Sequence, residues 1–252
     1  MADRAQSLSF DRVAEEYDVT RGGEERATTM ATAVLPVLPA GRILEAGVGT
    51  GIVAQQLQRR GTDILGIDIA PAMLGRARER LGPRVAVGDV HRLPVRSETV
   101  DGVLVVWMLH LVADVEVAVA ELARVLRPGG RLVVVPSRPL RPDVDVELIQ
   151  ERLWSRLQPN GRTDDVDRLV PLAERLGLHA VASSEFATKE YEISPAALAE
   201  VTRRRSFSIL FDVDDETWRR DVDPLIEELR ALPDQQRGRR VLHRYCLLAW
   251  EK

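Results

Sequence analysis

Seven residues between positions 45 and 110 have the types and spacing that a nucleotide-type ligand site requires. They are Glu45, Gly47, Gly49, Gly51, Asp68, Asp89 and His110. Alternating glycines let the backbone turn sharply and approach a ligand without a Cβ clash, and carboxylates accept hydrogen bonds from ligand hydroxyl or amino groups. A histidine takes up a proton near neutral pH. An ordinary strand-to-helix turn also uses glycine, but three glycines in this register favour a ligand-binding loop.

The elements that must hold these residues alternate along the chain. Short β-rich runs separated by helical patterns predict strands over residues 43–46, 63–67, 85–87, 100–107 and 132–135, and helices over 51–60, 71–81 and 115–126. Asp114 is expected to cap the last of these helices, and Pro128-Gly129-Gly130 to end it. Strands that are apolar throughout belong to a parallel sheet covered on both faces. We therefore predict a three-layer α/β/α sandwich with its ligand beyond the carboxyl ends of the strands.

The segments on either side of this core are predicted to be mainly helical. Two helices are expected within residues 10–38, broken at Arg21-Gly22-Gly23. Further helices are expected over residues 144–157, 164–176 and 216–232, and from Pro195 onward. Residues 180–193 look extended, and an apolar strand covers residues 245–250. The stretch 195–237 is therefore expected to lie between two strands.

The spacing of the glycines separates three kinds of nucleotide site. A dinucleotide fingerprint has its third glycine where this chain has Ile52, and a phosphate-binding P-loop needs a Gly-Lys-Ser/Thr sequence that does not follow here. The run Glu45-Ala46-Gly47-Val48-Gly49-Thr50-Gly51 instead resembles motif I, E-x-G-x-G-x-G, of the class I S-adenosylmethionine-dependent methyltransferases.

Later motifs resemble the same family in the order that the family has them. Asp68-Ile69-Ala70-Pro71-Ala72-Met73 is similar to the family's D-x-S-x-x-M, and Gly88-Asp89-Val90 follows the third strand. The run Leu122-Ala123-Arg124-Val125-Leu126-Arg127-Pro128-Gly129-Gly130 precedes the fifth. Two departures are Ala70, where the family usually has serine, and Val48, where it has a small polar residue or cysteine. The resemblance covers about residues 10–136 and implies a Rossmann-like sheet with an antiparallel last strand.

The resemblance also implies S-adenosyl-L-methionine as the cofactor. In the family, the acid after the second strand binds the ribose hydroxyls, apolar residues flank adenine, and the acid after the third strand receives the adenine amino group. The residues of this chain that it implies for cofactor binding are Tyr17, Arg21, Glu45, Gly47, Gly49, Gly51, Asp68, Ile69, Met73, Asp89, Val90 and Trp107. Nothing visible in the sequence requires a metal ion.

Residues 10–18 resemble the amphipathic helix that closes over the cofactor in small-molecule relatives of the family. Tyr17 and Arg21 would then contact the methionine carboxylate or the substrate; the alternative is that the apolar side of this helix simply packs on the sheet. We predict a single methyltransferase domain over residues 1–252, with N-terminal lid helices at about 10–38, a cofactor-binding core at about 41–136, and a helical cap insertion at about 195–237.

The candidate for catalysis is His110, in the sequence Trp107-Met108-Leu109-His110-Leu111 just past the fourth strand. Methyl transfer from a sulfonium is an in-line displacement, and it needs a base only where the acceptor carries a proton that must leave. His110 is expected to be that base or a group that orients the substrate; a capping or packing histidine is the alternative. No (Asn/Asp)-Pro-Pro-(Tyr/Phe) motif follows the strand, which disfavours methylation of nucleic-acid amines.

Composition indicates the class of partner. The chain has 252 residues and 35 Lys+Arg against 39 Asp+Glu, a formal net charge of −4, so a strongly basic nucleic-acid module is excluded. The longest apolar run, 103–109, is far shorter than a membrane helix. We expect a soluble cytoplasmic protein with a small-molecule substrate and neither nucleic-acid nor membrane partner. Arginine clusters at 203–205 and 237–240 would suit an anionic substrate, or are solvated faces, and apolar cap residues would suit a partly apolar one; the oligomeric state stays open.

The function predicted from the sequence is methyl transfer from S-adenosylmethionine to a small-molecule acceptor, with O- or C-methylation favoured. Two alternatives remain at this point. One is a protein that binds S-adenosylmethionine without transferring its methyl group, and the other is a nicotinamide-dependent oxidoreductase. The early third glycine argues against the oxidoreductase, whereas no sequence feature separates the non-methylating protein from a methyltransferase.

Overall fold

The computed structural model describes residues 17–20, 22–137, 144–158, 162–187 and 190–252. The chain forms two compact units. The first consists of residues 1–138, 163–188 and 245–252, and the second of residues 139–162 and 189–244. Each unit has its own buried apolar cluster. None of the helices in these described ranges is long and apolar enough to cross a membrane.

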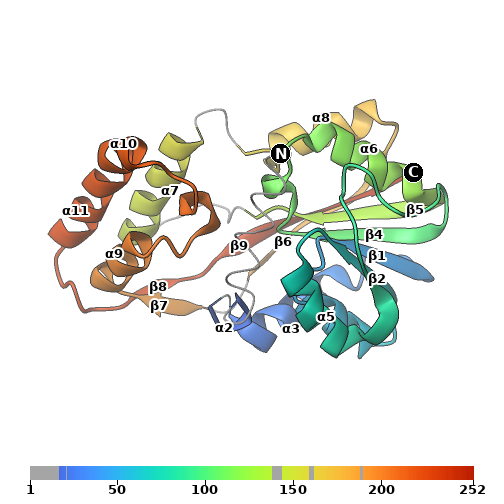
Figure 1. Cartoon of the computed structure of the whole chain (residues 1–252), viewed down its shortest axis with the longest axis horizontal. Helices are drawn as coiled ribbons and strands as arrows, with labels where there is room; N and C mark the ends of the chain where they lie inside the picture. The colour runs from blue at the N-terminus through green and yellow to red at the C-terminus, as the bar shows by residue number, and fades with distance from the viewer. Residues whose placement is uncertain (1–16, 21, 138–143, 159–161, 188–189) are drawn as a thin grey trace. The chain divides into compact units, whose positions relative to one another are not determined.

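The first unit is built on a sheet of seven described strands (Figure 1). Their order across the sheet is β3 (Val85–Val87), β2 (Asp63–Asp68), β1 (Arg42–Ala46), β4 (Val100–Val106), β5 (Leu126–Val135), β9 (Arg244–Glu251) and β6 (His179–Ala187). Strands β3, β2, β1, β4 and β5 pair in parallel, whereas β9 pairs antiparallel with β5. The antiparallel last strand expected from the family resemblance is therefore confirmed.

Helices cover both faces of this sheet. One face carries α3 (Gly23–Val34), α4 (Ile52–Gln58) and α5 (Pro71–Leu81), and the other carries α6 (Val115–Val125) and α8 (Val166–Arg175) (Figure 1). Shorter elements of the unit are α2 (Tyr17–Thr20), η1 (Gly82–Arg84) and η2 (Leu109–Leu111). The arrangement confirms the predicted three-layer α/β/α sandwich.

The central strands β4 and β5 carry apolar residues in unbroken runs because both faces of the sheet are buried there. Val103, Leu104 and Val105 of β4 are each 0% exposed, and Val133 of β5 likewise. Fully burying side chains of this size contributes about 1.5–3 kcal/mol each, so the continuous runs stabilise the centre of the sheet. The parallel register then brings the carboxyl ends of β1, β2 and β4 to one edge.

The predicted start and end of the helix over 115–126 can both be compared with α6. The Asp114 side chain accepts hydrogen bonds from Glu116 N and Val117 N at 3.0 and 3.1 Å, so the predicted cap is confirmed. Strand β5 starts at Leu126, immediately after the helix, and not at residue 132. The Pro-Gly-Gly sequence is accommodated inside the strand by a shift of register opposite β4, where Val100 pairs with Leu126 and Gly102 with Arg131.

The second unit packs helices around a short hairpin. Its described elements are α7 (Asp145–Leu157), β7 (Tyr191–Ile193), α9 (Pro195–Arg203), η3 (Ser208–Leu210), α10 (Asp215–Thr217), η4 (Trp218–Val222), α11 (Asp223–Ala231) and β8 (Arg239–Val241). Strands β7 and β8 pair antiparallel. The helix predicted over 216–232 is present as a continuous helical run over 215–231. Within it, η4 is a π-helical turn, and Pro224, which lacks an N–H, lies at the start of α11. The stretch 180–193, predicted to be extended, contains the two strands β6 and β7, which belong to different sheets.

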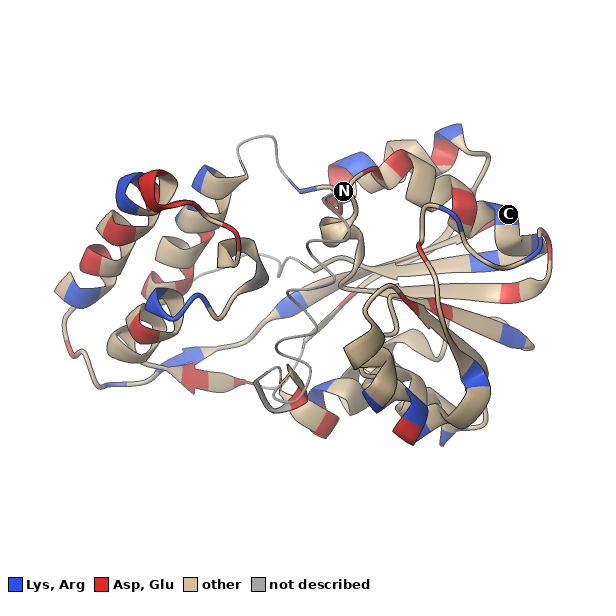
Figure 2. Ribbon diagram, in the orientation of Figure 1, with Lys and Arg blue, Asp and Glu red and all other residues tan. Residues whose placement is uncertain are grey.

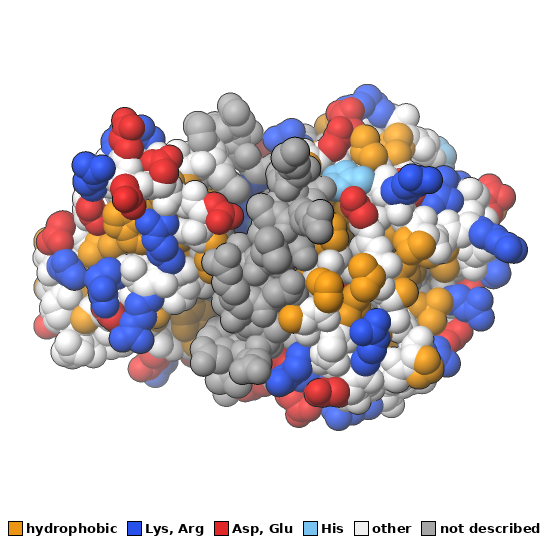
Figure 3. All heavy atoms as spheres, in the orientation of Figure 1, with side chains coloured by type: hydrophobic (Ala, Val, Ile, Leu, Met, Phe, Trp, Pro, Cys, Tyr) orange, Lys and Arg blue, Asp and Glu red, His pale blue; other side chains and the backbone are white. Residues whose placement is uncertain are grey.

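The arginine clusters of the second unit are engaged by neighbours within it. Glu200 accepts hydrogen bonds from both Arg203 and Arg204, and the Arg205 guanidinium lies 4.1 Å from the Trp218 ring centroid. Arg239 pairs with Asp145. Acidic and basic residues are interspersed along the ribbon of this unit (Figure 2), and acidic and basic side chains are interspersed over the visible surface of each unit (Figure 3). An anionic substrate is not required to explain these arginines, and it stays a prediction.

Candidate functional site

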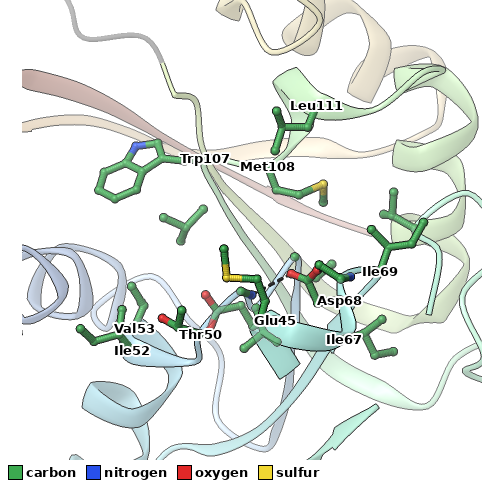
Figure 4. A pocket seen from close by; sticks show the side chains of 18 of the residues that line it. Glu45, Thr50, Ile52, Val53, Ile67, Asp68, Ile69, Trp107, Met108 and Leu111 are labelled. Atoms are coloured by element: carbon green, nitrogen blue, oxygen red, sulfur yellow. Dashed lines mark hydrogen bonds between the residues drawn. The ribbon is translucent and has the colours of Figure 1, made fainter. Parts of the chain in front are cut away.

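A cavity of about 190 Å³ opens at the carboxyl ends of β1, β2, β3 and β4. All of its lining residues lie between Tyr17 and Val112, within the first unit. Most of the side chains that face it are apolar, and Asp68, Glu45 and Thr50 contribute oxygen atoms (Figure 4). The cavity therefore occupies the edge of the sheet where the parallel topology predicts a ligand.

The glycine loop between β1 and α4 forms one wall of the cavity. Gly47, Gly49 and Gly51 all have positive φ, at 75°, 53° and 75°, which side chains rarely adopt. A Cβ on Gly47 would lie 2.3 Å from Met108 Cγ, whereas a Cβ on Gly49 would enter open space. Gly49 thus leaves room beside the backbone for a ligand. Gly51 does not line the cavity; its Cβ would meet Ala77 of α5 at 3.1 Å, so this glycine permits helix packing.

Asp68, the last residue of β2, holds the glycine loop in place. Its Oδ2 accepts a hydrogen bond from Gly49 N at 2.8 Å (Figure 4). Its Oδ1 accepts one from Ala70 N, also at 2.8 Å. The second bond satisfies a backbone donor just before α5, where Ala70 has no hydroxyl to cap the helix. A carboxylate has about four lone-pair sites, so Asp68 can hold the loop and also accept hydrogen bonds from a ligand at the cavity wall.

Asp89 and His91, which follow β3, form a linked pair in the cavity lining. Asp89 Oδ1 lies 2.8 Å from His91 N and 2.7 Å from His91 Nδ1. His91 Nε2 accepts a hydrogen bond from Asp114 N at 3.2 Å. Because Nε2 accepts, the neutral ring carries its proton on Nδ1 and donates it to Asp89. Both residues line the cavity, and His91 holds the Asp89 carboxylate against the start of α6.

Glu45 lies at the floor of the cavity and is 2% exposed. Its burial, together with the nearby charge of Asp68, raises the pKa of this carboxyl to about 8. Among the described residues, Oε2 of Glu45 has no hydrogen-bond partner. The glutamate of the glycine motif is therefore protonated at neutral pH in the ligand-free protein.

Helix α2 reaches the cavity through Tyr17 and Asp18. The Tyr17 ring packs against Ala70 and Met73. Asp18 accepts hydrogen bonds from Thr50 Oγ1 and from Arg80, both at 2.6 Å, and so ties α2 to the glycine loop and to α5. Asp18 was not singled out from the sequence, although it directly follows the tyrosine of the lid motif. Arg21, the other predicted lid contact, lies outside the described residues.

Trp107 and Arg26 form the wall nearest the end of β4. Trp107 has a φ of 50°, a strained value for an aromatic residue, and its ring lies 3.5 Å from the Arg26 guanidinium carbon. Tyr245 of β9 packs against the same tryptophan, with its ring centroid 5.2 Å from that of Trp107. Arg26 is the one Lys or Arg in the described lining. No motif marks it in the sequence.

His110 lies on η2, the short turn after β4. Its neighbours Met108 and Leu111 line the cavity, but His110 itself does not. Its Nδ1 is 3.8 Å from Oδ2 of Asp164, a buried carboxylate at the start of the segment that leads into α8. From the sequence, Asp164 was only the beginning of a helix, and nothing in its local sequence distinguishes it.

The structure brings most of the predicted cofactor residues to this one cavity. The residues of that set that line it are Tyr17, Glu45, Gly47, Gly49, Asp68, Ile69, Met73, Asp89, Val90 and Trp107. They come from segments spread over about ninety positions of the chain. The described residues contain no cluster of three or more His, Cys, Asp or Glu side chains that could bind a metal ion.

A parallel sheet with a glycine loop after β1 and acids after β2 and β3 defines a Rossmann-like class of nucleotide-binding enzyme. Residues 44–134 match the family model described as "Methyltransferase domain". A demethylmenaquinone methyltransferase of Mycobacterium sp. (strain KMS) is 38% identical over 174 residues, which are 66% of this chain and 75% of that protein. The chain belongs to the class I S-adenosylmethionine-dependent methyltransferases, and its cofactor is S-adenosyl-L-methionine.

A second relative and one solved structure are also similar to this chain. The biotin biosynthesis bifunctional protein BioHC of Cellvibrio japonicus is 33% identical over 212 residues, 82% of this chain but only 39% of that longer protein. A solved structure of a SAM-dependent methyltransferase from Thermotoga maritima superposes with a TM-score of 0.57 at 22% identity, covering 96% of this chain and 98% of that one. The last likeness concerns the fold alone.

Proposed function

We propose that this protein transfers the methyl group of S-adenosylmethionine to an oxygen or carbon atom of a small-molecule acceptor. The observation that carries the proposal is the cavity itself, where the family's motif residues converge beside an apolar wall made by Met108, Leu111 and Val112. The curated relatives named above act, by their names, on demethylmenaquinone or in biotin biosynthesis. Both names support a small-molecule acceptor for this chain.

The residues present fit the cofactor in shape and in chemistry. The space beside Gly49, which a Cβ would fill, suits a ligand that runs along the glycine loop. Asp68 would accept hydrogen bonds from ribose hydroxyls and Asp89 from the adenine amino group, while Ile69, Met73 and Val90 would flank the base. Arg26 supplies the positive charge that an amino-acid carboxylate needs. Gly47 and Tyr17 would complete the wall.

When bound, S-adenosylmethionine supplies an electrophilic methyl group on a sulfonium whose departure as a thioether needs no acid. The protein's own task is then to align the acceptor, exclude water and remove a proton where the acceptor carries one. We propose His110 for the proton, because it lies on the turn between two residues that line the cavity. We further propose that residues 195–237 help to select the acceptor.

The direct test is transfer of label from methyl-labelled S-adenosylmethionine to a panel of acceptors that includes quinols, phenols and carboxylic acids. Label in an organic product, absent without protein, is expected for at least one class. Cofactor binding without any label transfer would instead favour a protein that uses the cofactor in another way. With a substrate in hand, His110→Ala should lower the single-turnover rate and flatten its pH dependence; an unchanged rate at every pH would remove His110 from the mechanism.

A further inference from the structure

A segment far from His110 in sequence is tied to the turn that carries it. Thr163 Oγ1 donates a hydrogen bond to the carbonyl oxygen of Leu109 at 2.6 Å. One residue later, Asp164 Oδ2 accepts hydrogen bonds from Ser137 N at 2.7 Å and Ser137 Oγ at 2.6 Å, just past the end of β5. These three bonds fix the Asp164 carboxylate between the ends of β4 and β5.

Asp164 is buried to an extent that is unusual for a charged residue. It is 1% exposed, and a carboxylate withdrawn from water is costly unless hydrogen bonds or an opposite charge stabilise it. The two Ser137 donors satisfy Oδ2 of Asp164, and His110 Nδ1 approaches the same oxygen to 3.8 Å. The His110 side chain is itself only 13% exposed, so water screens this approach weakly.

Helix capping does not account for this carboxylate. The cap position of α8 belongs to Asp165, whose side chain makes no capping bond, and Asp164 lies one residue before it. Other acids near the turn have different surroundings. Asp114 is occupied as the cap of α6, and Glu116 pairs with Arg175 at the exposed surface.

We propose that Asp164 is a positioning residue for His110, which it turns into a base. The carboxylate holds the imidazole proton on Nδ1 and leaves Nε2 as the nitrogen that accepts the acceptor's proton. As that acceptor's O–H or C–H bond breaks, its proton goes to Nε2 while its electron pair forms the new bond to the methyl carbon, and the carbon–sulfur pair stays on sulfur. The imidazolium, stabilised by Asp164, later returns its proton to water. This assignment rests on the proposed role of His110.

A distance of 3.8 Å between His110 Nδ1 and Asp164 Oδ2 is longer than a hydrogen bond, but it is within the range over which a buried carboxylate acts on an imidazole. An opposite charge within about 4–6 Å favours the protonated form of an imidazole. Hydrogen bonds of catalytic groups are often long before substrate binds and shorten in the complex. The expected consequence in the free protein is therefore electrostatic, and it can be measured without any acceptor.

The test is a titration of the His110 ring by nuclear magnetic resonance in the full chain, with His110→Gln used to assign its signal among the four histidines. Asp164→Asn is expected to lower the pKa of His110 by about one unit, a tenfold change in the protonation equilibrium. The matched control is Glu116→Gln, which makes the same acid-to-amide change at an exposed carboxylate near the turn and should leave the pKa of His110 unchanged. Asp164→Glu should restore most of the lost shift.

If Asp164→Asn does not fold, the tautomer of the neutral His110 ring in the wild type still tests the proposal. Nitrogen shifts above the pKa are expected to report a proton on Nδ1; a neutral ring protonated on Nε2 would overturn the proposal. An unchanged His110 pKa in folded Asp164→Asn would overturn it as well. The pKa of His110 and the position of its ring proton are both measured without methyl transfer. If no acceptor were methylated, the proposed function would be contradicted, but these two results would be unaffected. With a substrate, the acidic limb of the kcat profile should shift in Asp164→Asn by the same amount.

Discussion

Glu45 is a cavity-lining residue whose ionisation the fold changes strongly. Burial raises its pKa from 4.5 in an ordinary environment to about 8. Between these two pH values the folded chain holds a proton that the unfolded chain has lost. The contribution of protonated Glu45 to stability is therefore fully present below pH 4.5 and is lost as the pH rises through 8.

We therefore expect Glu45→Gln to remove part of the pH dependence of folding. In the wild type this group should lower the free energy of unfolding by about 1.4 kcal/mol per pH unit across the window. The variant should be more stable than the wild type at pH 9 and closest to it at pH 5. Urea unfolding at pH 5, 7 and 9 measures this difference, and a difference that does not grow with pH would contradict the assigned burial.

Gly49 and Gly51 have different surroundings: Gly49 borders the open space of the cavity, whereas Gly51 packs against α5. Gly49→Ala places a Cβ in the open space of the cavity wall at a φ of 53°, so it should weaken binding of S-adenosylhomocysteine at least tenfold and cost about 1–2 kcal/mol of stability. Gly51→Ala presses its Cβ on Ala77 and Leu81 at 3.1 Å and should cost more stability. Calorimetric binding and thermal unfolding of both variants test the contrast. If Gly49→Ala and Gly51→Ala lose the same affinity and the same stability, the two glycines do not have these different roles.

At the scale of elements, a partly buried ion pair between Asp18 and Arg80 ties α2 to α5. Arg80 donates to Asp18 and also to the carbonyl oxygen of Thr50 at 2.7 Å, which joins α5, the glycine loop and α2. Arg80→Met should cost about 1.5–3 kcal/mol and weaken S-adenosylhomocysteine binding, because hydrogen bonds to charged groups are lost on a cavity-lining segment.

The matched control is Arg84→Met, just beyond the same helix, where the pair with Asp63 is 42–44% exposed. That change should cost no more than about 1 kcal/mol and leave binding unaltered, since exposed pairs contribute little. Urea unfolding and calorimetry of the two variants supply the comparison. If Arg80→Met binds the ligand as tightly as Arg84→Met does, α2 does not support the cavity.

The sequence predicted the central sheet well because burial on two faces forces its strands to be apolar throughout. The glycine loop and the acids after β2 and β3 were found because backbone geometry demands glycine there and chain order brings the acids to one edge. The π-helical turn within residues 216–232 was missed because helical periodicity continues across Pro224. Strand β8, which is Arg-Arg-Val, has no strand-like pattern of its own.

Site residues supplied by tertiary packing could not be predicted from the sequence. Arg26 contacts Trp107 and Tyr245, which are far away along the chain, and no local pattern distinguishes it from other helical arginines. Asp164 meets His110 only because Thr163 and Ser137 tie three segments together. Gly51 lay inside the recognised motif, yet its neighbours in space assign it to packing.

At the scale of the whole molecule, the cavity and the second unit have separate cores. Every described lining residue of the cavity belongs to the first unit, whereas Leu153 is 2% exposed in the core of the second. Leu153→Ala should cost about 2–5 kcal/mol through the cavity it creates. At a temperature where the chain stays folded, binding of S-adenosylhomocysteine should change less than twofold. Scanning calorimetry and titration measure both, and a large loss of affinity would contradict cofactor binding by the first unit alone.

The most direct test of the account is a calorimetric titration of the full chain with S-adenosylhomocysteine and, separately, with NADH. The cavity at the ends of β1 to β4 predicts saturable binding of one S-adenosylhomocysteine per chain, weakened at least tenfold in Gly49→Ala, and no binding of NADH. Binding of NADH without binding of S-adenosylhomocysteine would contradict the assignment of this cavity to a methyltransferase.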